Sequence, residues 1–393
     1  MDDALPGARS GVLPARGTDA VPGATGAAGA TARGDLGARL AFPILAVLLL
    51  AALPLALDAF RLALVGKYLS FAFAAVGIVL VWGYGGILSL GQGIFFGLGS
   101  YAMAMFLKLE AAAAQDSSGS ALSQFYGSSL PDFMVWNSIE QLPWWWRPFH
   151  FLPFTLAAIV VLPAAVAYAL AYANFRKRVS GVYFSIVTLA LAAILSIVII
   201  GQQGYTGGVN GITDFRTFAG FALDDARVRL ALYFATALLL LAAVAVGRFV
   251  VASRLGRVLV AIRDREDRVR FSGYDPALFK AFVFALAATM TAVGGALFTL
   301  HEGLASPSLV GIVPSIEMVI YAAVGGRLSL VGAVYGTLLV FWAKTFFSEN
   351  FVNVWLYFVG GLFIVVVMFM PSGLAGLAEQ WRARRAQARE PRA

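Results

Sequence analysis

Residues 181–200 read GVYFSIVTLALAAILSIVII, a run of apolar and small side chains that contains no charged residue. Because an α-helix rises about 1.5 Å per residue, roughly 20 such residues span the hydrocarbon core of a bilayer. Comparable runs recur along the 393-residue chain, which is 60% hydrophobic and 13% charged, with a mean hydropathy of +0.81. The runs lack the alternation of outer-membrane β-strands. The sequence therefore predicts an all-α polytopic membrane protein rather than a soluble enzyme.

The hydrophobic runs divide the chain into a tail, a membrane domain and a second tail. Residues 1–40 are rich in Ala, Gly and Thr and predict a disordered segment, whereas 373–393 predict a basic cytoplasmic tail. Residues 41–372 predict a single transmembrane domain. We expect about ten membrane spans, with nine or eleven as alternatives because the first and eighth are short: 41–57, 66–82, 87–107, 152–173, 181–200, 229–250, 280–300, 312–326, 331–347 and 352–370.

Lys and Arg residues concentrate on one side of the predicted bundle. The two tails and the loops 174–180 and 251–280 hold most of the 29 basic residues. Cytoplasmic loops of membrane proteins carry such an excess, so we expect both termini to be cytoplasmic. On the opposite side, the loop 108–151 contains Trp144-Trp145-Trp146. This run indicates either an aromatic belt at the membrane interface or a docking surface for an extracytoplasmic partner.

The composition disfavours several kinds of chemistry. The chain contains no cysteine, and its two histidines, His150 and His301, lie far apart in the sequence. Thiol chemistry is therefore excluded, and a histidine-based metal site or catalytic triad is improbable. No G-x-x-x-x-G-K-[ST] loop is present, so we expect the chain to use no cofactor and to obtain energy from a partner or an ion gradient. The net charge of +8 follows from the basic loops and does not require nucleic acid as a partner.

Residues 254–270 predict a short amphipathic helix between two spans. Leu255, Val258, Leu259 and Ile262 recur at spacings of three and four, which gives one apolar stripe. Acid-first pairs at i,i+4, such as Glu266 and Arg270, support the helix. The helix is expected either to rest on lipid headgroups or to seat its stripe in a groove of a partner protein. Because acidic residues interleave with the basic ones, nucleic acid is the less favoured partner.

This segment also carries a family resemblance. Gly-Arg-Val-Leu-Val-Ala-Ile-Arg-Asp-Arg-Glu at 256–266, followed by Gly273, resembles the coupling-helix signature of LivM-like permease subunits in branched-chain amino-acid-type ABC importers. The resemblance covers most of 60–375 and includes the glycine-rich stretch 84–93 and the stretches 315–318 and 325–333. Val269 and the turn 327–329 depart from the family pattern. The resemblance implies an ATPase-coupling role for Leu255, Gly256, Arg257, Ala261, Ile262, Arg263, Glu266 and Gly273, with Arg263 and Glu266 at the rim of the contact.

Within that family the chain looks most like the urea-transport permease. The similarity lies in Asp132-Phe133-Met134-Val135 with the Trp-rich loop, in 210–215 and in 353–357. It implies a subunit of an ATP-driven importer in a bacterial inner membrane, moving urea or a related small amide or amino acid by alternating access. The implied partners are a second homologous permease, two ATP-binding subunits, a periplasmic solute-binding protein and membrane lipid. An ion-coupled secondary transporter or a passive channel is the alternative.

Polar and glycine-rich positions inside the predicted membrane domain are candidates for the solute pathway. Gln92 offers an amide to a small polar solute, although interhelical hydrogen bonding explains it equally well. Glu317 lies in an apolar stretch, where an acid is costly and serves either a pathway or helix pairing. Dense glycine after residue 203 indicates a broken or re-entrant turn. The predicted pathway residues are Gly91, Gln92, Gly93, Thr206, Gly207, Gly208, Asn210 and Glu317.

Overall fold

The computed structural model describes residues 40–117, 130–179, 181–351 and the positions 357, 360, 361, 364, 373 and 376. The chain forms two units, Met1–Pro43 and Ile44–Ala393, and the description below concerns the second. The predicted tail 1–40 lies outside the described residues except for Leu40. The last predicted span, 352–370, and the tail 373–393 also fall largely outside them.

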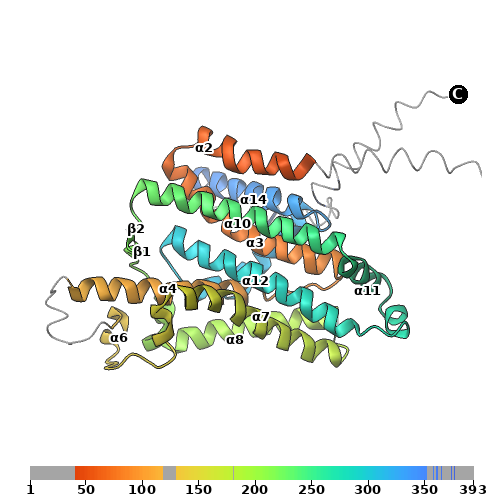
Figure 1. Ribbon diagram of the computed structural model, residues 1–393, viewed down its shortest axis with the longest axis horizontal. Helices are drawn as coiled ribbons and strands as arrows, with labels where there is room; N and C mark the ends of the chain where they lie inside the picture. The colour runs from red at the N-terminus through yellow and green to blue at the C-terminus, as the bar shows by residue number, and fades with distance from the viewer. Residues whose placement is uncertain are drawn as a thin grey trace, which may run out of the picture. The chain divides into compact units, whose positions relative to one another are not determined.

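Helices account for nearly all of the described secondary structure (Figure 1). Within the described residues, seven helices are long and apolar enough to cross a membrane: α3 with its continuation η2 (Ala59–Ile78 and Val79–Tyr84), α4 (Gln92–Ser117), α7 (Leu152–Arg176), α8 (Val182–Gly201), α10 (Ala226–Ala252), α12 (Pro276–Glu302) and α14 (Leu330–Asn350). Two shorter apolar helices are Leu40–Ala56, which includes η1 (Leu48–Ala52) and α2 (Leu53–Ala56), and α13 (Ile312–Gly325). The prediction of an all-α polytopic protein is confirmed.

Small elements occupy the two ends of the bundle. At one end lie α6 (Asp132–Trp136), η3 (Arg147–His150), α9 (Gln203–Thr206), η4 (Gly208–Asn210), the antiparallel pair β1 (Thr217–Phe218) and β2 (Phe221–Ala222), and η5 (Pro307–Leu309). At the opposite end, α11 (Arg254–Phe271) connects α10 to α12 (Figure 1). The charge distribution predicts that α11 is cytoplasmic, so the end opposite α11 is called the predicted outer side.

Local sequence explains where several helices begin. The carboxylates of Asp58, Asp225 and Asp275 each accept a hydrogen bond from a backbone N–H in the first turn of α3, α10 and α12. Ser329 caps α14 in the same way. These side chains satisfy donors that a helix N-terminus leaves without partners. The cap at Asp58 starts α3 seven residues earlier than the predicted span 66–82, and the helix tolerates Arg61 and Lys67 near that end.

Helix α12 forms the centre of the bundle and packs against α3, α4 and α7. The apolar stretch of α12 is 72% buried and those of α3 and α4 are 83% buried, compared with 28% for α7 and α8, which place most of their apolar surface outside the bundle. Glycine permits the close contact of α12 with α4, because a Cβ on Gly295 would lie 1.9 Å from the carbonyl oxygen of Phe96. A Cβ on Gly99 would likewise lie 1.9 Å from the carbonyl oxygen of Ala292. Small residues at such crossings are typical of membrane helices.

The third span differs from its predicted bounds of 87–107. Helix α4 begins at Gln92, and no helix is assigned between Gly85 and Gly91. Gly86 has a φ of +69°, a conformation that glycine adopts without strain and that turns the chain away from the axis of η2. The glycines therefore break the apolar run into a helix end, a non-helical stretch and a new helix.

We expect Gly295→Ala to lower the melting temperature of the purified protein. The new methyl group would collide with backbone of α4, and overpacking a membrane core costs about 1–3 kcal/mol. Gly201→Ala is the matched control, because nothing lies within 4 Å of a Cβ built at that position. Thermal unfolding in detergent measures both variants. Equal melting temperatures would contradict the assigned α4–α12 contact.

Candidate solute pathway and coupling helix

A cavity of about 1000 Å³ opens between α3, α8, α12, α13 and α14. Its walls come from the beginning of α3 and α13 and from the last turns of α8, α12 and α14, which all lie at the predicted outer side. The lining residues are Phe60, Leu64, Lys67, Tyr68, Phe71, Ala193, Ser196, Ile197, Phe298, Ser308, Leu309, Gly311, Ile312, Val313, Pro314, Glu317, Phe341, Lys344, Thr345, Ser348 and Glu349.

Aromatic rings line part of this cavity. The ring centroid of Phe71 lies 5.3 Å from that of Phe298 and 5.1 Å from that of Phe341. Tyr68 stacks on Phe341 with the centroids 4.4 Å apart, and its hydroxyl group is hydrogen-bonded to that of Thr345. Phe71, Phe298 and Phe341, here called the aromatic floor, thus form one continuous apolar surface contributed by three helices.

Two lysine–glutamate pairs lie beside the aromatic floor. Lys344 Nζ lies 3.0 Å from Glu317 Oε1, and Lys67 Nζ lies 2.7 Å from Glu302 Oε1. Glu317 also accepts a hydrogen bond of 2.9 Å from the hydroxyl group of Tyr321. Charges within a membrane domain are costly unless they are paired or face water, and each of these four groups is paired. The sequence predicts Glu317 as a pathway residue but does not predict Lys67 or Lys344. In the sequence, these lysines are marked only by a charge inside or beside an apolar run.

Gln92 lies outside the lining of this cavity. It is fully buried at the start of α4, where its Oε1 accepts a 3.2 Å hydrogen bond from the hydroxyl of Thr291 in α12. Its Nε2 has no hydrogen-bond partner among the described residues. Gly91 packs against backbone of α8 at Thr188, and the N–H of Gly93 donates to Ser315 Oγ at 3.0 Å. These contacts place Gln92 in a packed interface, and its pathway role stays a prediction.

Two hydroxyl groups of α8 pair with backbone groups of the non-helical stretch 85–91. Ser185 Oγ donates to the carbonyl oxygen of Leu88 at 2.7 Å, and the N–H of Leu90 donates to Thr188 Oγ1 at 3.2 Å. Non-helical backbone at membrane depth is tolerated only where protein or water satisfies its polar groups. Ser185 and Thr188 meet this requirement from α8.

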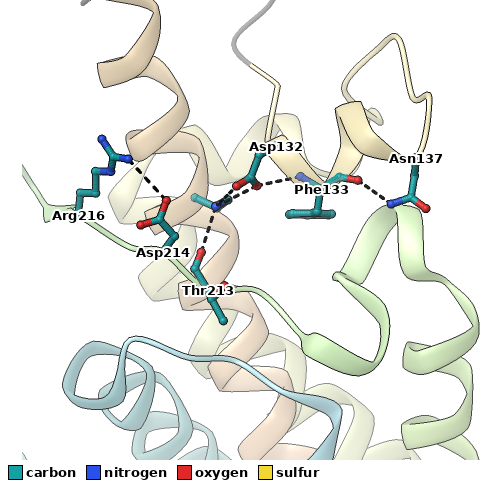
Figure 2. A network of polar contacts seen from close by, with 7 residues as sticks. Asp132, Phe133, Asn137, Thr213, Asp214 and Arg216 are labelled. Atoms are coloured by element: carbon teal, nitrogen blue, oxygen red, sulfur yellow. Dashed lines mark hydrogen bonds and ion pairs between the residues drawn. The ribbon is translucent and has the colours of Figure 1, made fainter. Parts of the chain in front are cut away.

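The residues 130–150 and 203–223, here called the outer cap, pack together at the predicted outer side. Figure 2 shows its polar centre around Asp132 and Thr213. Lys108 Nζ lies 3.0 Å from the carboxylate of Asp132 and donates to the carbonyl oxygen of Thr213 at 3.0 Å. Glu110, also from α4, accepts hydrogen bonds from the backbone N–H groups of Ala219 and Gly220. The end of α4 therefore contacts both segments of the outer cap through Lys108 and Glu110.

The predicted pathway residues Thr206, Gly207, Gly208 and Asn210 belong to the outer cap rather than to the cavity lining. Gly207 and Gly208 have positive φ angles, and the Thr206 hydroxyl donates to the carbonyl oxygen of Ile199. Helix η4, which contains Gly208 and Asn210, contacts η5, whose residues Ser308 and Leu309 line the cavity. The structure thus brings this loop next to the cavity, and its participation in a pathway stays a prediction.

The Trp-rich run separates into buried and exposed members. Trp146 is fully buried in a cluster with Phe133, Met134 and Ile212, whereas Trp144 is 80% exposed. Interfacial anchoring or partner docking therefore stays a prediction for Trp144 and is wrong for Trp146, which belongs to the core of the outer cap. The sequence run did not reveal this difference, because it depends on contacts with 133–134 and 212.

Helix α11 uses its apolar stripe within the chain. Leu259 and Ile262 are buried, with 0% and 2% exposure, and Gly256 packs against backbone of α10. The expectation that the stripe seats in a groove of a partner is therefore wrong for these residues, because this chain already covers them. Arg257, Ala261 and Gly273 are exposed, and Leu255 is half-buried. Phe271, at the end of α11, is 92% exposed and adds an apolar group to the free face.

Arg263 and Glu266 hold α11 to the membrane helices. Arg263 Nη1 donates to the carbonyl oxygen of Gly83 at 2.7 Å, next to the non-helical stretch 85–91. Glu266 forms ion pairs with Arg270 at 3.2 Å and with the nearly buried Lys280 of α12 at 2.6 Å. About a third of each side chain stays exposed, so the position of both residues at a partner's rim stays a prediction. A kink at Arg265, with φ −152° and ψ 83°, lies between them.

Comparison with known proteins identifies the family. Residues 60–368 match the family described as branched-chain amino acid transport system / permease component. The chain belongs to this family. The permease is 24% identical to the high-affinity branched-chain amino acid transport system permease protein LivM of Salmonella typhimurium over 326 residues, which cover 77% of this chain and 67% of the relative. The LivM protein of Escherichia coli is 23% identical over 326 residues, which again cover 77% of this chain and 67% of the relative.

A shorter match connects the permease to BraD of Pseudomonas aeruginosa, a high-affinity branched-chain amino acid transport system permease protein. The two are 30% identical over 132 residues, which cover 33% of this chain and 43% of BraD. No solved structure shows a significant match to the permease. The family consists of transport permease components, which agrees with a multi-pass membrane protein and not with an enzyme.

We expect Glu266→Gln to destabilise the permease by roughly 1–3 kcal/mol, because it leaves the Lys280 ammonium nearly buried without its carboxylate. Asp267→Asn, at the exposed neighbouring position, is the matched control and should change stability little. Thermal unfolding of both variants, and of Glu266→Gln combined with Lys280→Gln, measures the coupling. If the effects of the two substitutions simply add, the ion pair does not stabilise the fold.

Proposed function

We propose that the permease is the membrane subunit of an ATP-driven importer that carries urea, or a related small amide or amino acid, across a bacterial inner membrane. The observation that supports this most is the cavity of about 1000 Å³ at the predicted outer side, with charged groups beside apolar walls. In the proposal this cavity receives the solute from outside, and alternating access then opens the path towards the cytoplasm.

Separate ATP-binding subunits supply the energy in this proposal. The sequence lacks a phosphate-binding loop, and membership of a permease-component family supports a division of labour between subunits. The exposed side of α11, with Arg257, Arg268 and Phe271, is the surface we assign to ATPase contact. Two ATP-binding subunits, a second homologous permease and a periplasmic solute-binding protein complete the proposed assembly.

Urea is the leading solute because the outer cap contains the stretches that resemble the urea-transport permease. The two stretches in the described region that resemble the urea-transport permease, 132–135 and 210–215, lie far apart in sequence, but Lys108 joins Asp132 to Thr213. They also share a hydrophobic cluster with Trp146. Because the two stretches belong to one structural unit, their similarity to the urea-transport permease supports a single shared feature rather than two unrelated matches.

A branched-chain amino acid is the second candidate solute. LivM and BraD are both named as permeases of branched-chain amino acid transport systems, which favours this class. The cavity offers paired charges and apolar walls, and these are also suitable for a zwitterion with an aliphatic side chain. An ion-coupled transporter or a channel remains the alternative in mechanism, and it requires no ATPase partner.

Uptake into proteoliposomes tests this function. We expect the assembled complex, with binding protein and internal ATP, to accumulate radiolabelled urea, and vesicles that contain the permease alone to accumulate none. Excess unlabelled acetamide should compete, whereas leucine should not. Leucine accumulation without urea uptake would select the amino-acid alternative. Uptake by the permease alone would contradict the ATP-driven mechanism.

A further inference from the structure

Each of the two cavity lysines is placed over a ring of the aromatic floor. Lys67 Nζ lies 5.8 Å from the ring centroid of Phe298, and Lys344 Nζ lies 6.0 Å from that of Phe341. Both rings contact Phe71, so the two ammonium groups flank one continuous aromatic surface. Each ammonium group also has a carboxylate partner, Glu302 for Lys67 and Glu317 for Lys344. The cavity therefore combines donors, acceptors and flat apolar faces.

Helix pairing alone does not account for the Glu317–Lys344 ion pair. Helices α13 and α14 already meet at a glycine contact, where a Cβ on Gly325 would lie 2.1 Å from the carbonyl oxygen of Gly332. A Cβ on Gly336 would lie 2.4 Å from the backbone nitrogen of Gly325. The ion pair lies on the cavity wall instead, with 23% of the Glu317 side chain and 28% of the Lys344 side chain exposed. Both charges are therefore within reach of a molecule in the cavity.

The chemistry of these groups suits a small planar amide. A carboxylate accepts up to about four hydrogen bonds, and an ammonium group donates three. Glu317 can thus accept from amide N–H groups, and an ammonium group of the same cavity can donate to the carbonyl oxygen. The rings of the aromatic floor are 4–6% exposed and contribute an apolar wall against which a planar amide can lie. A simple hydrocarbon cavity would offer none of the polar contacts, and an exposed ion pair would lack the apolar wall.

We propose that Glu317, Lys344 and Lys67, arranged over Phe71, Phe298 and Phe341, form a binding site for a small planar amide such as urea. The inference rests on the proposed function and deepens it, because it names the residues that hold the solute during transport. Lys67 belongs to α3 and Lys344 to α14, so an amide bound between them would bridge helices on two sides of the cavity.

Protection of an engineered cysteine tests the site directly. The natural chain has no cysteine, so Ser348→Cys introduces a single thiol on an exposed, cavity-lining position. In the assembled complex in proteoliposomes, we expect millimolar urea to slow maleimide labelling of this thiol several-fold. Glycerol at the same concentration should have no effect. Ser138→Cys, exposed in the outer cap, is the matched control and should label equally fast with or without urea.

The amide-binding groups are then changed in the Ser348→Cys background. We expect Glu317→Gln and Lys344→Gln each to abolish protection by urea. Urea protection that persists in both variants would overturn the proposal, as would an absence of protection in a complex that transports urea. The second outcome leaves the proposed function intact, whereas a complex that transports no urea at all contradicts the function itself.

A charge exchange separates binding from helix pairing. The double variant Glu317→Lys with Lys344→Glu preserves an ion pair between α13 and α14 but moves the carboxylate to the other helix. If the pair binds solute, the exchange leaves urea uptake and protection low while the complex still assembles. Restoration of both to the wild-type level would show that the pair is structural only, and the proposal would be wrong.

Discussion

The hydrogen bonds that satisfy the non-helical stretch 85–91 are the constraint on which the rest of the structure depends. Backbone groups within a membrane domain need partners, and here Ser185 and Thr188 of α8 supply them to Leu88 and Leu90. This support accompanies the break between the end of η2 and the start of α4 at Gln92. Without Ser185 and Thr188, the carbonyl group of Leu88 and the N–H of Leu90 would lose these partners within the membrane domain, which is costly.

The position of α4 links the two ends of the permease. Close to its start, Gly93 donates to Ser315 in α13, two residues before Glu317 on the cavity wall. Further along, Lys108 and Glu110 fasten the outer cap. On the predicted cytoplasmic side, Arg263 of α11 contacts Gly83, and the Tyr84 hydroxyl donates to the carbonyl oxygen of Leu328. We infer that a displacement of α11 reaches the cavity wall through 85–91, α4 and α13.

Much of this fold could be predicted from the sequence, because helix length and hydrophobicity are local properties. The runs at 152–173 and 181–200 correspond closely to α7 and α8. The start of α4 was missed because an apolar run continues through Ile87 and Leu88, and only the glycines signalled a break. The stripe on α11 was recognised as an apolar face, but periodicity cannot tell whether lipid, a partner or the same chain covers it.

The cavity was the least predictable part of the permease. Glu317 was found from its charge in an apolar setting, whereas its partner Lys344 lies on the following helix and Lys67 pairs with Glu302 across 235 positions. Such pairings depend on how distant helices pack, which a single sequence does not specify. The same holds for Trp146, whose burial requires segments from two separate loops.

The connection between α11 and the cavity is the central claim, and a distance measurement tests it most directly. Nitroxide labels at Ala193 and Ser348, on opposite walls of the cavity, would report its width by double electron–electron resonance in the assembled, transporting complex. The account predicts that ATP binding shifts the distance distribution and that Arg263→Gln, which weakens the contact with Gly83, suppresses the shift. Identical distributions with and without ATP, in a complex that hydrolyses ATP and takes up solute, would contradict it.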